Sequence, residues 1–302
     1  MRKIACLVLI NIFSAALIAC TPQALPTEQG GVSLTSTPVP LPDANVVLVR
    51  ADPQRTGLYD FPAIREQPSV VWQVKVSSSS WLMPPLLADG ILYTGSGDGV
   101  LYALNAATGE TLWSADGFEA LESTGAVGGD LIITGGFSQL VKAMNYKRGE
   151  ERWSYRTEFG VQAAPLIVDE RVFIATDRPV YALDLKTGEM IWKVSTGTEG
   201  AFMGAPAYED GVIYTTGGKI LLALDAESGE ELWRVEKPEI FLGLAVANRH
   251  IYVGNWDKHM YAFDQTNGDE LWSFESEQFF WSAPAVDGDT VYVGNIDRFL
   301  YA

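Results

Sequence analysis

The sequence has very few of the residues that build disulfides, metal centres and catalytic triads. It contains two cysteines, Cys6 and Cys20, and two histidines, His250 and His259. Both cysteines lie in the first twenty residues, so we expect no disulfide and no cysteine-rich metal framework in the folded part. The histidines fall at opposite ends of one predicted hairpin, about 17 Å apart at strand spacing. They therefore cannot share a metal ion or a proton, and neither is placed to activate a serine.

Basic residues are also scarce. The chain has 21 Lys and Arg against 38 Asp and Glu, a formal net charge of -17. A surface this acidic repels phosphate backbones and anionic lipid, so nucleic acid is not an expected partner.

The one long apolar run is at the N-terminus. Arg2 and Lys3 precede an apolar stretch that is short for a membrane-spanning helix, which is the layout of a secretory signal. Its last four residues, Leu17-Ile18-Ala19-Cys20, resemble the lipobox of bacterial lipoproteins. Residues 1–20 are thus predicted to be a lipoprotein signal peptide with lipidation at Cys20, and the alternative is an ordinary signal peptide with an incidental cysteine. We expect an exported protein, lipid-anchored in the cell envelope: at the outer membrane of a diderm host, or the outer face of the cell membrane of a monoderm.

Residues 21–44 are rich in Pro, Thr, Ser and Gly and poor in large apolar side chains. Such a segment cannot bury enough apolar surface to offset the entropy lost on ordering, so it reads as a disordered tether.

Beyond the tether, one phrase recurs. Copies of it are "YALNAATGETLW", "KAMNYKRGEERW", "YALDLKTGEMIW", "LALDAESGEELW" and "YAFDQTNGDELW". The closing tryptophans, with Trp72 one step upstream, are 39 to 41 residues apart. A fixed period of this length indicates stacked structural units. Each unit offers four short runs rich in β-branched and aromatic residues, and the Asp and Gly between the last two suit a tight turn. Four strands per forty residues is typical of a propeller blade.

The predicted fold is all-β: a six-bladed propeller of four-stranded blades over residues 45–302, with blades from about residue 69. Six inner strands are found, but the last blade stops before its outer strand, whereas residues 69–74 form an extra outer strand at the front. We expect these two ends to pair and close the ring, which would leave no exposed sheet edge. The rival interpretation is a truncated ring of seven or eight blades. Residues 45–68 form a lead-in that no blade accommodates.

The phrase "YALDxxTGExxW" resembles the repeat of the quinoprotein-like (PQQ-like) β-propellers, over roughly residues 50–302. "RADPQRTGLYD" at residues 50–60 is also similar to a lead-in of some members. The resemblance implies that the tryptophan closing each outer strand docks on the neighbouring blade as a staple. The staples would be Trp72, Trp113, Trp153, Trp192, Trp233 and Trp272.

The same ring serves enzymes and binding scaffolds. The enzymatic branch implies bound pyrroloquinoline quinone and usually Ca²⁺. This chain lacks that branch's vicinal cysteine pair, and Asp98, Asp177, Asp257 and Asp297 are expected to cap turns rather than hold calcium. We expect no enzyme activity, cofactor or metal. The alternatives are a PQQ-dependent dehydrogenase and a small-ligand sensor.

The binding branch is similar to the propeller lipoprotein of the outer-membrane β-barrel assembly machinery. It implies a monomeric, membrane-tethered scaffold that binds a protein or peptide. Aromatic residues outside the staples gather on the face formed by the loops into the inner strands and between second and third strands. The predicted contact residues are Trp81, Phe202, Phe241, Trp256, Phe280 and Trp281. Trp81, Phe202 and Phe280 also fit a set that recurs in every blade, which favours packing between blades for them.

Overall fold

The computed structural model describes residues 46–48, 52–56, 69–77, 82–121, 125–197 and 204–302. The leader with Cys20, the tether of residues 21–44, and two predicted contact residues, Trp81 and Phe202, lie outside the described residues. The chain divides into Met1–Pro40 and Leu41–Ala302, and every described residue belongs to the second unit. The described residues form strands and turns. None of their segments is a helix with the length and apolar character needed to span a bilayer.

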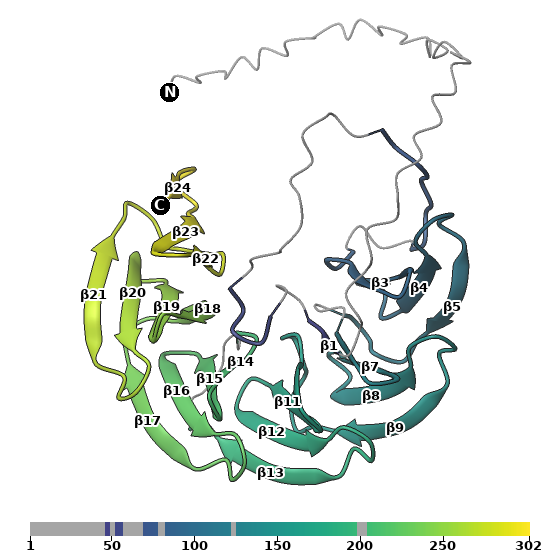
Figure 1. Cartoon of the computed structure of the whole chain (residues 1–302), viewed down its shortest axis with the longest axis horizontal. Helices are drawn as coiled ribbons and strands as arrows, with labels where there is room; N and C mark the ends of the chain where they lie inside the picture. Colours follow the sequence, from purple (N-terminus) through teal and green to yellow (C-terminus); the bar gives the residue numbers. More distant parts are fainter. Residues whose placement is uncertain (1–45, 49–51, 57–68, 78–81, 122–124, 198–203) are drawn as a thin grey trace, which may run out of the picture. The chain divides into compact units, whose positions relative to one another are not determined.

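Within the second unit, six antiparallel sheets follow one another in chain order. Each begins with a strand near the centre, and in the five complete blades the last strand lies at the rim (Figure 1). This confirms the predicted six-bladed propeller. The first blade consists of β2 Leu86–Ala88, β3 Ile91–Gly95, β4 Leu101–Asn105 and β5 Thr111–Ala115. The second consists of β6 Ala126–Gly128, β7 Leu131–Gly135, β8 Leu140–Asn145 and β9 Glu151–Arg156. The third consists of β10 Leu166–Val168, β11 Arg171–Ala175, β12 Pro179–Asp184 and β13 Met190–Ser195.

The other three blades continue the same order. The fourth blade consists of β14 Ala207–Glu209, β15 Val212–Gly217, β16 Ile220–Asp225 and β17 Glu231–Glu236. The fifth consists of β18 Phe241–Ala247, β19 His250–Asn255, β20 His259–Asp264 and β21 Glu270–Glu275. The sixth consists of β22 Ala285–Asp287, β23 Thr290–Gly294 and β24 Leu300–Tyr301. In the second, third and fourth blades the second and third strands are mostly buried, because both faces of such a blade are covered by neighbouring blades.

Every outer strand carries a bulge at the same place. In the third blade the register shifts between Ala182 and Leu183, which pair with Trp192 and Met190 and leave Ile191 unpaired. The other four complete blades repeat this shift. A bulge adds local twist to a strand. The residue it leaves unpaired points to solvent, and the exposed Leu112, Ile191, Leu232 and Leu271 all occupy this position.

The staple tryptophans join each blade to the next. In five of them the indole N–H donates to a backbone oxygen in the following blade's turn, at 2.9 to 3.2 Å. The pairs are Trp72 to Ala106, Trp113 to Tyr146, Trp153 to Leu185, Trp192 to Ala226, and Trp233 to Gln265. Each ring also lies against the glycine of that turn, so closely that a Cβ there would fall within 2.5 to 2.8 Å of it. Trp272 is the exception: it is 42% exposed, and no hydrogen bond from its indole N–H is found among the described residues.

The lead-in runs along the innermost strands, a role that the sequence left unassigned. Strand β1, Val46–Val47, pairs with β6 and makes the second blade five-stranded. Further on, the carbonyl oxygens of Pro53, Gln54 and Thr56 accept the N–H groups of Tyr208, Val246 and Val286, one in each of the last three blades.

Arg55 stands at the middle of this segment. It is only 1% exposed and has a positive φ of 60°. Its guanidinium donates to the carbonyl oxygens of Pro206 and Pro165, which precede the inner strands of the fourth and third blades. The lead-in therefore connects the inner strands of five successive blades, from the second to the sixth.

The expected closure of the ring is not found among the described residues. The last blade has three strands, and residues 69–77 form no strand. Strand β24 is two residues long, so it offers few backbone groups for a ladder. Trp72 nevertheless occupies the staple position on the first blade, while Val70 and Val71 of the same segment are both 82% exposed.

Candidate functional site

Three aromatic rings gather where the turn between β19 and β20 meets the loop before β22. Trp256 lies in the turn, and Phe279 and Trp281 lie in the loop. The ring centroids are 5.6 Å apart for Trp256 and Phe279, 6.3 Å for Trp256 and Trp281, and 6.2 Å for Phe279 and Trp281. These spacings suit attractive aromatic pairs. Trp281 is 58% exposed, so this aromatic cluster presents an indole ring to solvent.

Two asparagines hold these loops in place. Asn255 is fully buried; its amide donates to Glu239 O, and its side-chain oxygen accepts the N–H of Asp257. Asn295 repeats the arrangement one blade later, donating to Gln278 O and accepting from Asp297 N–H. Neither residue was predicted from the sequence, although their matching positions within the repeat were a usable signal.

Ser276 ties the loop before β22 to the turn that carries Trp256. Its backbone N–H and its hydroxyl both donate to Lys258 O. The aromatic cluster is therefore supported from both of its loops, which lowers the entropy lost when a partner binds.

One polar atom of the cluster is unpaired. The indole Nε1 of Trp256 is buried and has no hydrogen-bond partner. A buried donor without an acceptor is destabilising, and the loss is recovered if a rearrangement brings a carbonyl oxygen to it.

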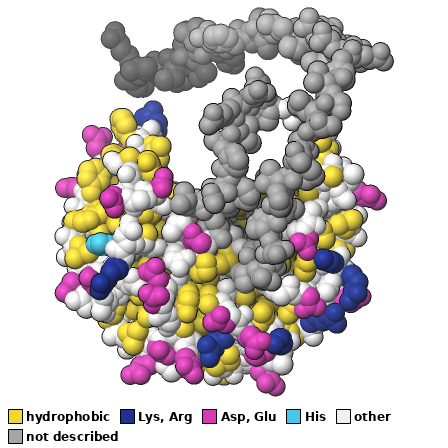
Figure 2. Space-filling model, in the orientation of Figure 1, with side chains coloured by type: hydrophobic (Ala, Val, Ile, Leu, Met, Phe, Trp, Pro, Cys, Tyr) yellow, Lys and Arg dark blue, Asp and Glu magenta, His cyan; other side chains and the backbone are white. Residues whose placement is uncertain are grey.

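The loops around the cluster are acidic. Glu239, Glu275 and Glu277 are exposed, and Lys258 is a basic exception. Acidic side chains also spread around the rim of the face seen in Figure 2, whereas Lys and Arg gather mainly on one part of it. The cluster thus lies in a negative field that attracts cationic groups and disfavours anionic ones.

Two of the predicted contact residues require correction. Phe241 and Phe280 are both fully buried, because they point into the blades rather than out from the loops. Phe241 packs on Tyr261 and Phe263, and Phe280 packs on Tyr301. Of the six predicted contact residues, the structure brings together Trp256 and Trp281.

Three of the four aspartates after the second strands, Asp98, Asp257 and Asp297, cap their turns. Asp257 accepts from Tyr261 OH and His259 N–H, and Asp297 accepts from Tyr301 OH and Phe299 N–H. Asp177 differs, since burial raises the pKa of its carboxyl group. Within the described ranges, no three side chains of the Asp, Glu, His or Cys type converge in a way that would hold a metal ion.

Comparison with known proteins places the chain among propellers of one family. The chain is 30% identical to the outer membrane protein assembly factor BamB of Yersinia pestis over 151 residues, which are 44% of this chain and 38% of that protein. It is 27% identical to the quinohemoprotein alcohol dehydrogenase ADH IIB of Pseudomonas putida over 151 residues, 42% of this chain and 22% of that enzyme. The match spans well under half the length of these curated relatives.

A solved structure agrees on the fold. BamB from Moraxella catarrhalis superimposes with a TM-score of 0.61 at 22% sequence identity, covering 70% of this chain and 72% of that one. The family model described as outer membrane protein assembly factor BamB matches residues 27–123, 119–215 and 176–302. The chain, whose repeats form the blades described above, therefore belongs to the outer membrane protein assembly factor BamB family.

Proposed function

We propose that this protein is a non-catalytic scaffold of the bacterial cell envelope, anchored by lipid at Cys20, that takes part in outer-membrane protein assembly. It binds a protein or peptide partner through the loop face that carries Trp256, Phe279 and Trp281. The observation that carries the proposal is the exposed indole of Trp281 stacked on Trp256. Aromatic anchors of this kind dominate many protein interfaces.

The rigid support of the cluster favours binding over catalysis. The side chains of Asn255 and Asn295 fix both loops, and the acidic surroundings favour a partner with basic and apolar groups. The family membership supports this choice of process, since the relative from Yersinia pestis is itself named as an assembly factor.

The experiment is complementation. A Gram-negative strain lacking its own BamB is supplied with the full chain or with Trp281→Ala, and the folded outer-membrane β-barrel proteins are quantified. We expect the wild-type chain to restore assembly, and Trp281→Ala to reduce that restoration several-fold.

The matched control is Leu232→Ala, which removes a side chain of similar exposure from the bulge of an outer strand, at 49% against 58% for Trp281. We expect it to restore assembly as the wild-type chain does. Equal assembly with Trp281→Ala and Leu232→Ala would rule out this surface, whereas no restoration by the wild-type chain would rule out the process.

A further inference from the structure

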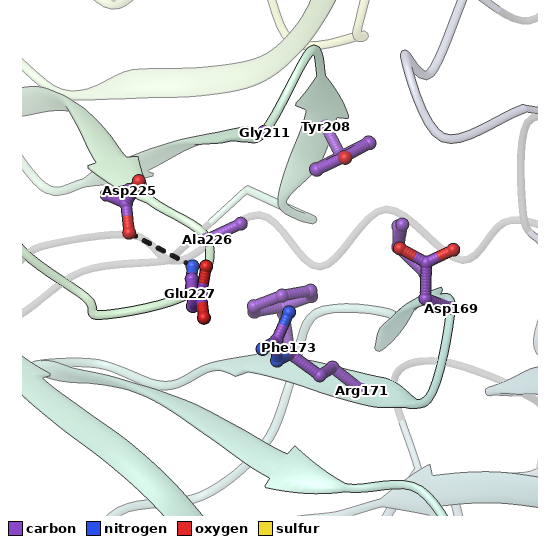
Figure 3. A pocket seen from close by; sticks show the side chains of 9 residues that line it. Asp169, Arg171, Phe173, Tyr208, Gly211, Asp225, Ala226 and Glu227 are labelled. Atoms are coloured by element: carbon purple, nitrogen blue, oxygen red, sulfur yellow. Dashed lines mark hydrogen bonds between the residues drawn. The ribbon is translucent and has the colours of Figure 1, made fainter.

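A cavity of about 220 Å³ opens at the seam between the third and fourth blades, on the side of the Asp-Gly turns and away from the aromatic cluster. Figure 3 shows Phe173 and Arg171 of β11 in its wall, with the turn carrying Asp225, Ala226 and Glu227 to one side. Asp169 and Tyr208 lie to the other side. Neither the proposed function nor the family membership assigns a role to this cavity.

The repeat provides an internal reference for what fills such a seam. At the seam between the first and second blades, Tyr146 occupies the position of Ala226, and Asp89 that of Asp169. The hydroxyl of Tyr146 donates to Asp89 at 2.5 Å, and Lys147 Nζ lies 3.1 Å from the same carboxylate. Tyr146 itself is only 7% exposed. That seam is thus closed by a phenol ring and an ammonium group on one carboxylate.

The third seam, between the third and fourth blades, keeps a carboxylate at this position, that of Asp169, but lacks both the phenol and the ammonium group. Ala226 is too small to reach Asp169, and Glu227 replaces the ammonium group of Lys147 with a second carboxylate. Leu185 and Gln265 fill the corresponding position at the other two seams between complete blades. No hydrogen bond or ion pair involves the Asp169 carboxylate among the described residues.

Charge and shape point to one class of ligand. The cavity brings three carboxylates, Asp169, Asp225 and Glu227, against one guanidinium, that of Arg171. Asp225 is already engaged by Ser228, so Asp169 and Glu227 are the carboxylates open to a ligand. The partly exposed ring of Tyr208 lies at the side of the cavity and the ring of Phe173, which is 1% exposed, lies at its floor; aromatic faces also attract cations.

We propose that this cavity, between Asp169 and the Ala226–Glu227 turn, binds an organic cation: an ammonium or guanidinium group carried on an aromatic or aliphatic stem. The stem lies on Phe173 and Tyr208 where Tyr146 lies in the second blade, and the cation lies between Asp169 and Glu227. The source is either a free amine or a basic side chain of a partner chain, because both carry the same groups.

The ligands to be tested are chosen from the groups that fill the first seam, the phenol of Tyr146 and the ammonium group of Lys147. Tyramine carries a phenol and an ammonium group and represents the free amine; the capped peptide acetyl-Asn-Tyr-Lys-Arg-Gly-amide, the sequence of residues 145–149, represents a partner side chain. The charge control is 4-hydroxyphenylacetate, which has the same ring with a carboxylate. Binding to the full chain is measured by ligand-observed NMR, and for a ligand of this size we expect a Kd on the order of 1 mM for tyramine.

Two variants make the test specific. The double variant Ala226→Tyr, Glu227→Lys gives the third seam the residues of the first, and we expect it to lose binding at least tenfold. Asp169→Asn changes an exposed side chain without altering its size, so it keeps the fold while weakening tyramine binding about tenfold.

The outcomes separate the sources. Binding of tyramine alone assigns the cavity to a free amine, and binding of the peptide assigns it to a partner side chain. The proposal is overturned if neither cation binds, if 4-hydroxyphenylacetate binds as well as tyramine, or if Asp169→Asn and the double variant bind like the wild-type chain. None of these results depends on the complementation experiment, since the aromatic cluster is unchanged in every variant.

Discussion

At the scale of single residues, the first four blades are each held to the next by a tryptophan against a glycine. Gly188 has a φ of +72°, and a Cβ there would lie 2.5 Å from the ring of Trp153. Two demands act on this position: a left-handed backbone and the absence of a side chain. Its recurrence as Gly109, Gly149, Gly229 and Gly268 explains why the phrase "TG" or its equivalent returns in each repeat.

Gly188→Ala separates the two demands. We expect it to lower the free energy of unfolding by about 3 kcal/mol, because the backbone strain adds to overpacking against Trp153. Gly90→Ala is the control: its φ is +73°, but nothing lies within 4 Å of a Cβ there, so it should lose only about 1 to 2 kcal/mol. Urea unfolding of the two variants gives the comparison. Equal losses would mean that the contact with tryptophan adds nothing.

At the scale of elements, the lead-in connects blades that are far apart in the sequence. Arg55 bonds to residues 110 and 151 positions away. Arg55→Ala leaves the carbonyl oxygens of Pro165 and Pro206 without this donor, and we expect a loss of about 1 to 3 kcal/mol for each of them. Arg55→Lys should recover little, because an ammonium group lacks the forked geometry of a guanidinium.

Hydrogen exchange locates that effect. The amides of Tyr208, Val246 and Val286 donate to the lead-in, so they should exchange faster in Arg55→Ala, while amides between β15 and β16 keep their protection. Arg234→Ala is the control, since Arg234 is exposed and pairs with the nearby Glu231. Uniformly faster exchange in all blades would instead indicate global destabilisation.

The blades were predictable because their signals are local. A Gly and a Trp four residues apart recur about every forty residues, which is the period of the blade, so the repeat itself reveals both positions. That the Trp docks on the neighbouring blade was implied by the family resemblance. The lead-in carries no such period, and its partners are single carbonyl and amide groups that any residue provides. The burial of Phe241 was misjudged because position in a predicted loop says little about the direction of a side chain. The burial of Phe280 agrees with the packing that its recurrence in every blade favours. The cavity depends on one small residue, Ala226, whose effect appears only when two blades face each other.

At the scale of the whole molecule, one turn is repeated in every complete blade, and in three of them it carries an aspartate, so the effects of their titration on stability add up. Asp184, Asp225 and Asp264 accept N–H groups from the residues that follow, and these hydrogen bonds hold the pKa of each carboxyl group below its ordinary value of 3.8. At a pH between the pKa of such a carboxyl group in the folded chain and its pKa in the unfolded chain, the unfolded chain binds more protons than the folded one. The stability from these turns is therefore complete above about pH 5 and is lost as the pH falls through the folded pKa values.

The first two complete blades supply the matched replacement, because Asn105 and Asn145 hold the same position. Asn145 accepts the N–H groups of Lys147 and Arg148 at 3.2 and 3.0 Å, as the aspartates do in their turns. The triple variant Asp184→Asn, Asp225→Asn, Asp264→Asn should thus keep nearly the wild-type stability at pH 7 and lose stability less steeply between pH 5 and pH 3. Urea unfolding in 0.5 M salt, which screens the repulsion among the remaining carboxylates, measures this slope. Parallel curves for the variant and the wild type would show that the acid sensitivity of the ring arises outside its turns.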